Sequence, residues 1–418
     1  MKKNIKTYNV IDLFAGAGGF SEGFYQARKF NFLAHVEWEL PMIETLRANL
    51  IHRWGYTEAQ ALETTLHFDI QKVDQLISGF SQDSSLNEYK KSNSAKFVEK
   101  GLDGVINSLN VDIIIGGPPC QSYSIAGRAQ DPHSMKFDYR NFLFESFVKI
   151  VDHYKPSLFV FENVPGILSA KPGDEFVVNR IYKAFEEIGY EIRDPKNISK
   201  SIYLSSDFGV PQDRRRVILF GVNKQSKLCI EDLYRSLDIL KFSEPSLTVK
   251  DAIGNLPKLI PYIKPIKATG RTISHYQDHG DYIEYHVPRF HNARDIKAFE
   301  KWIIDGMNKA QSKEKLDFYE HITGRRSNHN KYRNLEWNKP SPTIVSHLYK
   351  DGLMFIHPDV EQKRSITVKE AALIQSFPDD YIFIGSSAYC FKMIGNAVPV
   401  RFANNIANAI VNYWESTI

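Results

Sequence analysis

The feature that most constrains the fold is an alternation, between residues 8 and 222, of short apolar runs with amphipathic stretches. The runs are rich in Val, Ile, Leu and Phe, which is typical of strands buried on both faces of a parallel sheet. The stretches Asn141 to Tyr154 and Phe176 to Ile188 carry apolar residues at three- and four-residue spacing, as helices covering such a sheet would. We therefore predict an α/β fold with a mainly parallel sheet. The predicted strands are Tyr8 to Phe14, Phe32 to Glu37, Leu66 to Asp69, Val111 to Ile115, Leu158 to Glu162 and Arg216 to Val222.

The alternation stops after Val222, and 418 residues are too many for one compact domain. The stretch from Ser246 to Ser365 mixes Pro, Gly, His and Tyr with short extended pieces and one helical stretch, Ala293 to Met307. We therefore predict a first domain over residues 1–245 and a second, smaller one over residues 246–365.

A C-terminal segment, residues 366–418, is expected to return to the first domain. Thr367 and Glu370 form a T-x-x-E capping box that opens a helix, and Pro378 ends it. A last helix, Val400 to Val411, has one apolar face that suits docking on a core. The polar stretch Gln71 to Asn107 is interpreted as an insertion with some helix.

The net positive charge of the chain is concentrated in the predicted second domain. The whole chain has 53 Lys and Arg against 49 Asp and Glu, a net charge of +4. Residues 246–365 hold 20 of the basic and 14 of the acidic side chains, so the rest of the chain is slightly acidic. Within them, Ile322 to Leu335 contains Arg325, Arg326, Lys331 and Arg333 and no acid. A solvated surface and a nucleic-acid contact are both consistent with such a run.

Cysteine usage and hydropathy indicate an intracellular protein. Cys120, Cys229 and Cys390 are too few and too scattered for a disulfide framework or a CxxC metal site, so we expect no metal. No run approaches the roughly 18 apolar residues of a membrane span. The basic start, Met1 to Tyr8, is followed by an apolar stretch that Asp12 and four glycines interrupt, which makes a poor signal peptide. We expect a cytoplasmic location.

A glycine-rich turn follows the first predicted strand, in the sequence DLFAGAGGFSEG from Asp12 to Gly23. Glycines allow a sharp turn and a close approach to a ligand, and the following helix N-terminus offers N–H groups. Dinucleotide enzymes, methyltransferases and simple tight turns share this feature. Glu37 ends the second strand, where a carboxylate can bind both hydroxyls of a ribose. Trp38 offers a face for stacking adenine, and Asp69 follows the third strand, so a nucleoside cofactor is predicted.

The most specific signal is GGPPCQSYS, from Gly116 to Ser124, directly after an apolar strand. The carboxyl ends of strands in an open parallel sheet line the ligand crevice. Two prolines stiffen the loop that presents Cys120 there. A buried, inert cysteine is the commoner case, but it usually lies within a helix or strand. We therefore interpret Cys120 as a presented nucleophile.

Two further strand ends are expected at the same crevice. Glu162, in FENV, closes an apolar strand and is a candidate proton donor, with a structural turn-capping role as the alternative. In QDRRR, an extended conformation places Gln212, Arg214 and Arg216 on one face and Asp213 on the other. Two guanidinium groups are thereby predicted to face the crevice.

Together these residues resemble the cytosine-C5 DNA methyltransferase family. The matching motifs are DLFAGAGG, GGPPCQ, FENV, QDRRR, ITVKEAALIQSFPDDY and IGNAVPV, in the family's usual order from Asp12 to Val400. The resemblance implies a Rossmann-like, doubly wound, mainly parallel sheet of the class I methyltransferase type. It also implies that the basic residues 246–365 form a target recognition domain.

The resemblance implies the chemistry and the cofactor. The Cys120 thiolate adds to C6 of a flipped-out cytosine, Glu162 protonates N3, and the methyl of S-adenosyl-L-methionine passes to C5, which leaves S-adenosyl-L-homocysteine. Arg214 or Arg216 favours the thiolate, and Arg216 holds the cytosine O2. The cofactor-binding residues implied are Phe14, Ala15, Gly16, Gly18, Gly19, Glu37, Trp38, Asp69, Ile70, Pro119 and Asn396.

Other functional classes account for the sequence less well. An NAD-dependent oxidoreductase leaves Cys120 and Glu162 unexplained, and so does a noncatalytic DNA-binding module. Amino-group methyltransferases carry a polar residue, two prolines and an aromatic residue where Gly117 and Cys120 bracket the prolines here. The alternative kept is a tRNA cytosine-5 methyltransferase of the same family, although the Cys-Phe-Thr tripeptide of those enzymes is absent.

The partners follow from the resemblance. No long regulatory extension precedes the catalytic motifs, which is similar to bacterial restriction-modification methyltransferases. We therefore expect a monomer that acts on double-stranded DNA in a bacterial cytoplasm, associated with the nucleoid through that DNA, paired with a cognate restriction endonuclease and without a membrane partner.

Overall fold

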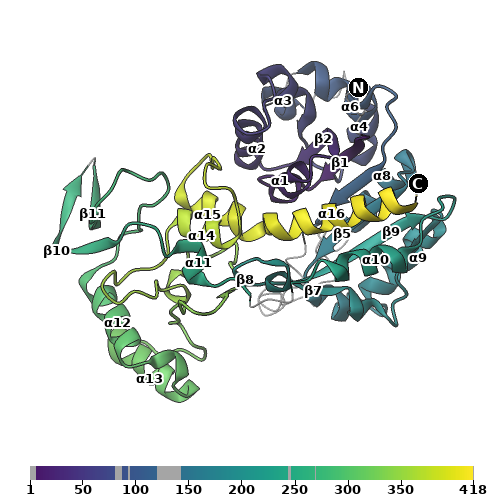
Figure 1. Cartoon of the computed structure of the whole chain (residues 1–418). Helices are drawn as coiled ribbons and strands as arrows, with labels where there is room; N and C mark the ends of the chain where they lie inside the picture. The colour runs from purple at the N-terminus through teal and green to yellow at the C-terminus, as the bar shows by residue number, and fades with distance from the viewer. Residues whose placement is uncertain are drawn as a thin grey trace.

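A central eight-stranded sheet organises the larger lobe (Figure 1). The computed structural model describes residues 6–80, 87–92, 95–119, 143–242, 246–268 and 270–417. The strand order is β3-β2-β1-β4-β5-β9-β6, with β7 also paired to β9. The strands are β1 (Tyr8–Leu13), β2 (Phe30–Glu37), β3 (Thr65–His67), β4 (Ile113–Gly116), β5 (Leu158–Asn163), β6 (Tyr190–Ile192), β7 (Ile202–Leu204) and β9 (Arg215–Asn223).

The predicted α/β class and mainly parallel sheet are confirmed, with antiparallel pairing at one side. Strands β1 to β5 pair in parallel, and β9 runs antiparallel to β5, β6 and β7. All six predicted strands form, each within two residues of the expected bounds, and Leu66 to Asp69 is one residue shorter as β3. The order reverses between β1 and β4, and the crevice at such a switch point is where open α/β sheets bind ligands.

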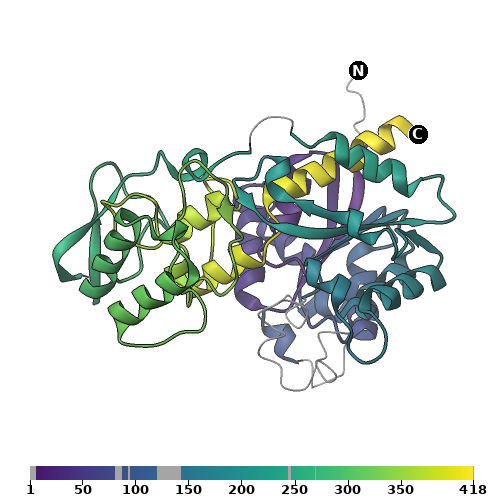
Figure 2. The same ribbon diagram turned by 90° about the horizontal axis from the view of Figure 1, so that it is seen from below.

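Helices cover both faces of the sheet, as the buried apolar strands require. Figure 2 shows helices on both sides of the sheet, and two hydrophobic cores result, one on each face. One face is covered by α4 (Val73–Ser78), α5 (Asn87–Ser92), α6 (Ala95–Ile106), α8 (Leu143–Tyr154) and α9 (Val177–Glu187). The other face is covered by α1 (Gly19–Gln26), α2 (Leu40–His52), α3 (Glu58–Thr64), α10 (Ile230–Ile239) and α16 (Val400–Thr417).

The C-terminal helix packs against the N-terminal part of the chain. Helix α16 packs on α1, and a Cβ on Gly23 would stand 2.4 Å from Cβ of Ala403 and 2.6 Å from the backbone oxygen of Val400. Only a glycine allows two helices to approach so closely. The first described strand, β1, and the last helix, α16, both belong to the larger lobe (Figure 1).

The smaller lobe has its own small core around Phe299, Trp302 and Tyr332. A second cluster joins it to the C-terminal segment. The predicted helix Ala293 to Met307 ends at Ile304, because Asp305 caps it and Gly306 turns left-handed at φ 61°. The elements of this lobe and of the segment are α11 (Val249–Ile253), β10 (Leu259–Ala268), β11 (Arg271–Gln277), α12 (Ala293–Ile304), α13 (Ser312–Thr323), α14 (Val368–Ile374) and α15 (Ser387–Asn396).

Two helix N-termini show how local sequence sets element bounds. The predicted capping box is confirmed, since Thr367 accepts a hydrogen bond from the Glu370 N–H and Glu370 accepts one from the Thr367 N–H. Helix α13 was not predicted, although Gln311 and Glu314 form the same kind of box and Gly324 ends the helix. The general signals of a cap and a stop were therefore present for both helices.

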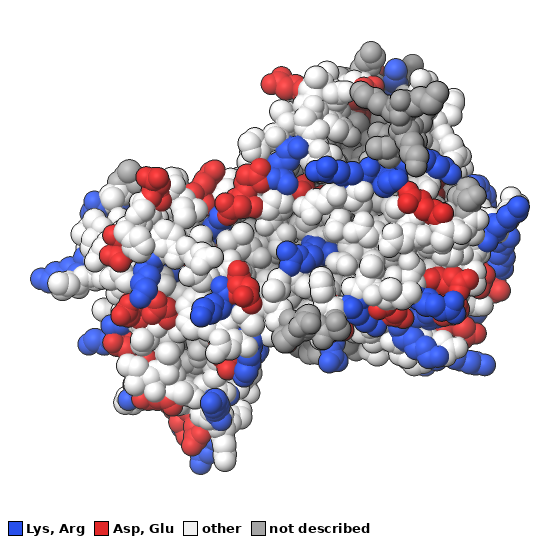
Figure 3. Space-filling model, in the orientation of Figure 1, with Lys and Arg blue, Asp and Glu red and all other residues white. Residues whose placement is uncertain are grey.

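Charges of both signs occur over both lobes on the face shown in Figure 3, where a row of Lys and Arg also crosses the larger lobe. This mixture agrees with the small net charge of +4. Among the described helices, none is long and apolar enough to cross a membrane.

Candidate active site

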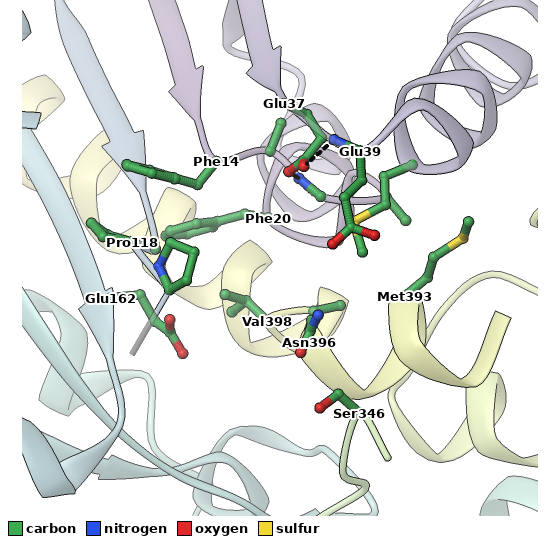
Figure 4. A pocket seen from close by; sticks show the side chains of 18 of the residues that line it. Phe14, Phe20, Glu37, Glu39, Pro118, Glu162, Ser346, Met393, Asn396 and Val398 are labelled. Carbon is green, nitrogen blue, oxygen red and sulfur yellow. Dashed lines mark hydrogen bonds between the residues drawn. The ribbon is translucent and has the colours of Figure 1, made fainter. Parts of the chain in front are cut away.

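A cavity of about 600 Å³ opens at the carboxyl ends of β1, β2, β4 and β5. Parallel strands end at a common edge, so polar residues that follow them converge there. Two distant segments close the cavity from the other side, namely residues 343–347 and 392–398. Figure 4 shows Phe14, Pro118 and Glu162 on one side of it, Glu39 and Met393 on the other, and Asn396 and Val398 between them.

The glycine-rich turn after β1 forms one wall. Phe14 adopts φ 60° and Gly16 φ 56°, so the chain is left-handed at both positions. This conformation is costly for a phenylalanine and is characteristic of ligand sites. A Cβ on Gly19 would lie 2.8 Å from the backbone oxygen of Val398, because the turn packs directly on the C-terminal segment. The turn is therefore held against the wall that carries Asn396.

Glu37, at the end of β2, organises the neighbouring backbone. Its carboxylate accepts hydrogen bonds from the N–H groups of Gly16 at 2.9 Å, Trp38 at 2.8 Å and Glu39 at 2.9 Å. Burial raises the pKa of Glu37, although these hydrogen bonds act in the opposite direction. Trp38 beside it is 57% exposed, so its ring is available for stacking. A buried carboxylate beside a free aromatic face suits a nucleoside.

Asp12 is a second buried carboxylate in the cavity. It is 1% exposed and accepts a hydrogen bond from the Ser21 hydroxyl. Burial raises the pKa of Asp12 to about 8, and the nearby charge of Glu37 adds to the effect. Near neutral pH its side chain therefore holds a proton. Asp12 was not among the predicted site residues, although its place near the end of an apolar strand was a usable signal.

Glu162 and Arg216 form an ion pair at the opposite side of the cavity. Arg216 Nε lies 2.8 Å from Glu162 Oε1, and both side chains are only 12% exposed. A Cβ on Gly117 would stand 2.8 Å from Glu162 Oε2, so this glycine lets the loop after β4 approach the carboxylate. Asn163 donates a hydrogen bond to the backbone oxygen of Pro118 at 3.3 Å. The loop before Cys120 is thus fixed beside Glu162.

Arg214 joins three segments. It is 2% exposed, and its two Nη atoms donate hydrogen bonds of 2.9 Å to the backbone oxygens of Ile344 and Gly395. Gln212 accepts a bond of 2.9 Å from the Ile344 N–H. Both backbone polar groups of Ile344 are therefore held by the segment that precedes β9. A Cβ on Gly395 would lie 2.3 Å from the carbonyl carbon of Val345, so α15 and residues 343–347 are in direct backbone contact.

A short parallel pairing anchors the same segment. Strand β12 (Ser341–Pro342) pairs with β8 (Gln212–Asp213), in the register Ser341 to Gln212. Gln212 also donates a bond of 2.8 Å to Gln375, which in turn donates to the backbone oxygen of Ile394. The QDRRR motif thereby attaches a segment of the smaller lobe and the end of α15 to the larger lobe.

The structure brings most predicted residues together. Glu162, Arg214 and Arg216 line the cavity, and Asp69 lines it while accepting a hydrogen bond from the Gln71 N–H. Gly18 does not line it, because it turns left-handed with its hydrogen atoms toward Leu46 and Tyr381. Cys120 lies outside the described residues. The predicted cofactor residues that do line the cavity are Phe14, Ala15, Gly16, Gly19, Glu37, Trp38, Asp69, Ile70, Pro119 and Asn396.

Several cavity residues were missed by sequence reasoning. Residues 343–347 come from the predicted second domain, and Glu39 and Lys392 are charged positions without a recognisable pattern. No local sequence pattern indicates that these positions line the cavity, because contacts between segments far apart in the sequence bring them there. No group of His, Cys, Asp and Glu that could hold a metal ion occurs among the residues that the structure describes.

Comparisons with known proteins give a consistent result. A family model described as C-5 cytosine-specific DNA methylase matches residues 8–91 and 85–412. The chain is 34% identical to Type II methyltransferase M.Bpa9945I from Bacillus paralicheniformis, over 96% of this chain and 98% of that protein. It is 30% identical to Type II methyltransferase M.DdeI from Desulfomicrobium norvegicum, over 98% and 89% respectively.

A solved structure shows the same fold. The crystal structure of the S. pombe Dnmt2 methyltransferase superposes with a TM-score of 0.55, over 98% of this chain and 99% of that one, at 14% identity.

Proposed function

The chain belongs to the C-5 cytosine-specific DNA methylase family, and from this premise we propose that its cavity holds S-adenosyl-L-methionine beside a flipped-out cytosine of duplex DNA. It is a DNA cytosine-5 methyltransferase. The observation that carries the proposal is the occurrence, in one cavity, of a nucleoside-type end around Glu37 and Trp38 and a paired Glu162 and Arg216 at the other side.

The residues at the first end suit the cofactor. Glu37 binds the ribose hydroxyls, and Trp38, Ile70 and Pro119 contact the adenine. The turn at Gly16 and the loop at Asn396 hold the methionine part. S-adenosyl-L-methionine supplies an electrophilic methyl group on a sulfonium. The open approach at Gly16, where a Cβ would meet nothing within 4 Å, supports this assignment.

The residues at the other end activate the base. C5 of cytosine is too weak a nucleophile for direct methylation, so the Cys120 thiolate forms a bond to C6 and Glu162 gives a proton to N3. The electron pair that reaches C5 then forms the bond to the methyl group as the methyl–sulfonium bond breaks, which would leave S-adenosyl-L-homocysteine. Loss of the C5 proton to water, return of the N3 proton to Glu162 and cleavage of the S–C6 bond release 5-methylcytosine and the thiolate. Arg216 orients Glu162 and binds the cytosine O2.

Arg214 has a positioning role in this proposal. Its contacts to Ile344 and Gly395 fix two cavity walls, and its guanidinium stays beside the pair of Glu162 and Arg216. A positive charge near the base end favours the Cys120 thiolate.

The smaller lobe supplies the contacts to DNA. A base must leave the duplex before C6 is accessible, and extrusion costs a few kcal/mol. Basic residues 325–333 provide phosphate contacts, and residues 246–365 read the sequence. We further propose that the protein works as a monomer on DNA in the bacterial nucleoid, alongside a cognate restriction endonuclease, since its relatives are named Type II methyltransferases.

The test is direct. Purified protein is incubated with unmethylated duplex DNA and S-adenosyl-L-methionine labelled in the methyl group, and the DNA is hydrolysed to nucleosides. Label in 5-methylcytosine supports the proposal, and bisulfite sequencing then locates the modified position. Label in another nucleoside, or in tRNA but not in duplex DNA under matched conditions, would overturn it.

A further inference from the structure

An ion pair at the edge of the cavity joins two elements far apart in the sequence. Both carboxylate oxygens of Glu39 lie 2.7 Å from Nζ of Lys392, 353 positions away. Glu39 precedes α2, directly after Trp38, whereas Lys392 belongs to α15. Both line the cavity, and the chemistry above uses neither of them. The pair therefore connects the wall built by β2 to the wall built by the C-terminal segment.

The same two walls are fastened more firmly away from the cavity. Asn49 of α2 donates a bond of 2.8 Å to the Ile382 backbone oxygen and accepts one of 3.0 Å from the Ile382 N–H. Thr45 accepts a bond of 2.8 Å from the Ile384 N–H. The middle of α2 is thus fixed to the C-terminal segment, while its start meets α15 through the ion pair.

The ion pair lies at the border between cavity and solvent. Its side chains are 33% exposed at Lys392 and 17% exposed at Glu39. Such partly exposed pairs contribute little net free energy, so they break and re-form readily. Met42 and Met393 line the cavity beside the pair, and unbranched thioether side chains repack easily. Glu39 and Met393 lie across the pocket from Glu162 in Figure 4, so opening here leaves the base end intact.

We propose that Glu39 and Lys392 form a latch that sets the residence time of S-adenosyl-L-methionine and of S-adenosyl-L-homocysteine. The two residues are positioning residues, which hold the walls of the cofactor end together by contacting each other. Exchange of cofactor requires the pair to separate, after which α15 and the start of α2 can move apart. This inference rests on the proposed function, since it names the regulation of the same cavity.

The dissociation rate of S-adenosyl-L-homocysteine tests the latch. Stopped-flow displacement is followed by the fluorescence of Trp38, with Trp38→Phe as the blank. Lys392→Met and Glu39→Gln should each raise the rate about two- to fivefold, and the double variant should be no faster than the singles. The charge-exchanged protein, Glu39→Lys with Lys392→Glu, should return within about twofold of wild type if each charge serves the other.

An ion pair on the surface of the larger lobe provides the control. Lys183→Met removes an ion pair of the same 2.7 Å length on the surface, with Glu175, and should leave the rate unchanged. Unaltered rates in the single variants overturn the latch. A charge exchange that is worse than either single variant also overturns it, because the side chains would then contact the cofactor itself. A wild-type protein that binds no S-adenosyl-L-homocysteine would instead refute the proposed function.

Salt provides a second measurement that needs no substitution. Ionic strength screens a partly exposed pair, so raising salt should speed dissociation from wild type. Lys392→Met, which has no pair to screen, should show a clearly weaker salt response. Equal responses of the two proteins would count against the latch even if the variant were otherwise perturbed.

Discussion

Arg216 Nε lies 2.8 Å from Glu162 Oε1 in a part of the cavity where both side chains are largely buried. The guanidinium therefore holds the carboxyl group in one orientation while its second oxygen stays beside Gly117. This relationship makes Glu162 a group that is presented for proton transfer and fixed by a neighbour.

Glu162→Gln should retain DNA and cofactor binding and lose roughly 10² or more in rate. The amide keeps the shape and can still accept a bond from Arg216, but it has no acidic proton for N3. Single-turnover methylation and binding titrations measure the two effects separately. Glu187→Gln, on the exposed face of α9, serves as control. Near-normal turnover would assign Glu162 a structural role.

DNA with 5-fluorocytosine at the target should trap the enzyme. Fluorine cannot leave as a cation, so the adduct between Cys120 and C6 persists after methyl transfer. It should require S-adenosyl-L-methionine, survive denaturing electrophoresis and map to the Cys120 peptide. Cys120→Ser should form none, because an alkoxide is far scarcer than a thiolate at neutral pH.

The other two cysteines provide the matched controls for the trap. Burial raises the pKa of Cys390 to about 11, so its thiol is a poor nucleophile. Cys390→Ser and Cys229→Ser should therefore trap as wild type does. An adduct on fluorinated RNA but not on duplex DNA would show that the substrate is RNA and would leave the proposed covalent mechanism unchanged.

Arg214→Lys should lower kcat by roughly tenfold or more, because displaced cavity walls misalign the reacting groups. One ammonium cannot reproduce two bonds diverging to Ile344 and Gly395. The loss of a buried partner should also reduce the free energy of unfolding by about 1–3 kcal/mol. Arg215→Lys, at an exposed neighbouring position, should change neither quantity. Unchanged kcat with reduced stability would limit Arg214 to a structural role.

Acid should destabilise the smaller lobe before the sheet. The sheet holds a buried histidine too, His35, whose pKa burial lowers to about 4. The buried Asp12 of β1 has its pKa raised to about 8, so its contribution to stability grows as pH falls and opposes that of His35. Burial lowers the pKa of His275 to about 4 and of His291 and His357 to about 3. Below the unfolded value near 6.5 the unfolded chain binds protons that the folded lobe refuses, so stability falls as pH drops from about 6.5 toward 4. Each histidine contributes up to about 1.4 kcal/mol per pH unit in that window.

Hydrogen exchange at pH 7.5 and 5.5 separates the two lobes in that experiment. Amides of α12 should lose protection at the lower pH, and those of β1 and β4 should not. His279→Gln, at an exposed position, should have no effect. Equal protection of α12 at both values would mean that the buried histidines do not limit the stability of the lobe.

Neutralising Arg325, Lys331 or Arg333 should weaken DNA binding and reduce the log–log salt slope by about one unit each. Neutralising Arg326 should reduce the salt slope by less, because its Nε already lies 3.0 Å from Oε1 of Glu320. Arg235→Met, on the exposed side of α10, is the control. An unchanged slope in all four variants would mean that these basic residues form an ordinary solvated surface without phosphate contacts.

The sequence predicted those parts of the site that follow directly from strand ends. Glu37 and Glu162 close buried apolar runs, and parallel strands bring their ends to one edge whatever the remaining chain does. The direction of β9 was not readable, because an apolar run looks the same in a parallel and an antiparallel pair.

The second half of the site depends on contacts between distant segments. Gln212 meets Gln375 across 163 positions, and Arg214 reaches Gly395 across 181. No periodicity or motif encodes such distances, so Ile344 and Lys392 were not identified. Gly18 is a predicted cofactor residue that does not line the cavity, and its left-handed backbone, at φ 85°, shapes the turn.

The attachment of Ser341 to Gln212 has a consequence for anyone who exchanges recognition modules between relatives. A crossover placed after residue 344 would import a foreign strand that must pair with β8 and fit under Arg214. It would also bring a foreign backbone against Gly395, where no spare space exists. The crossover of a chimaera should therefore lie before residue 341. The recognition residues are then exchanged, while the contacts of residues 341–345 that shape the cavity stay native.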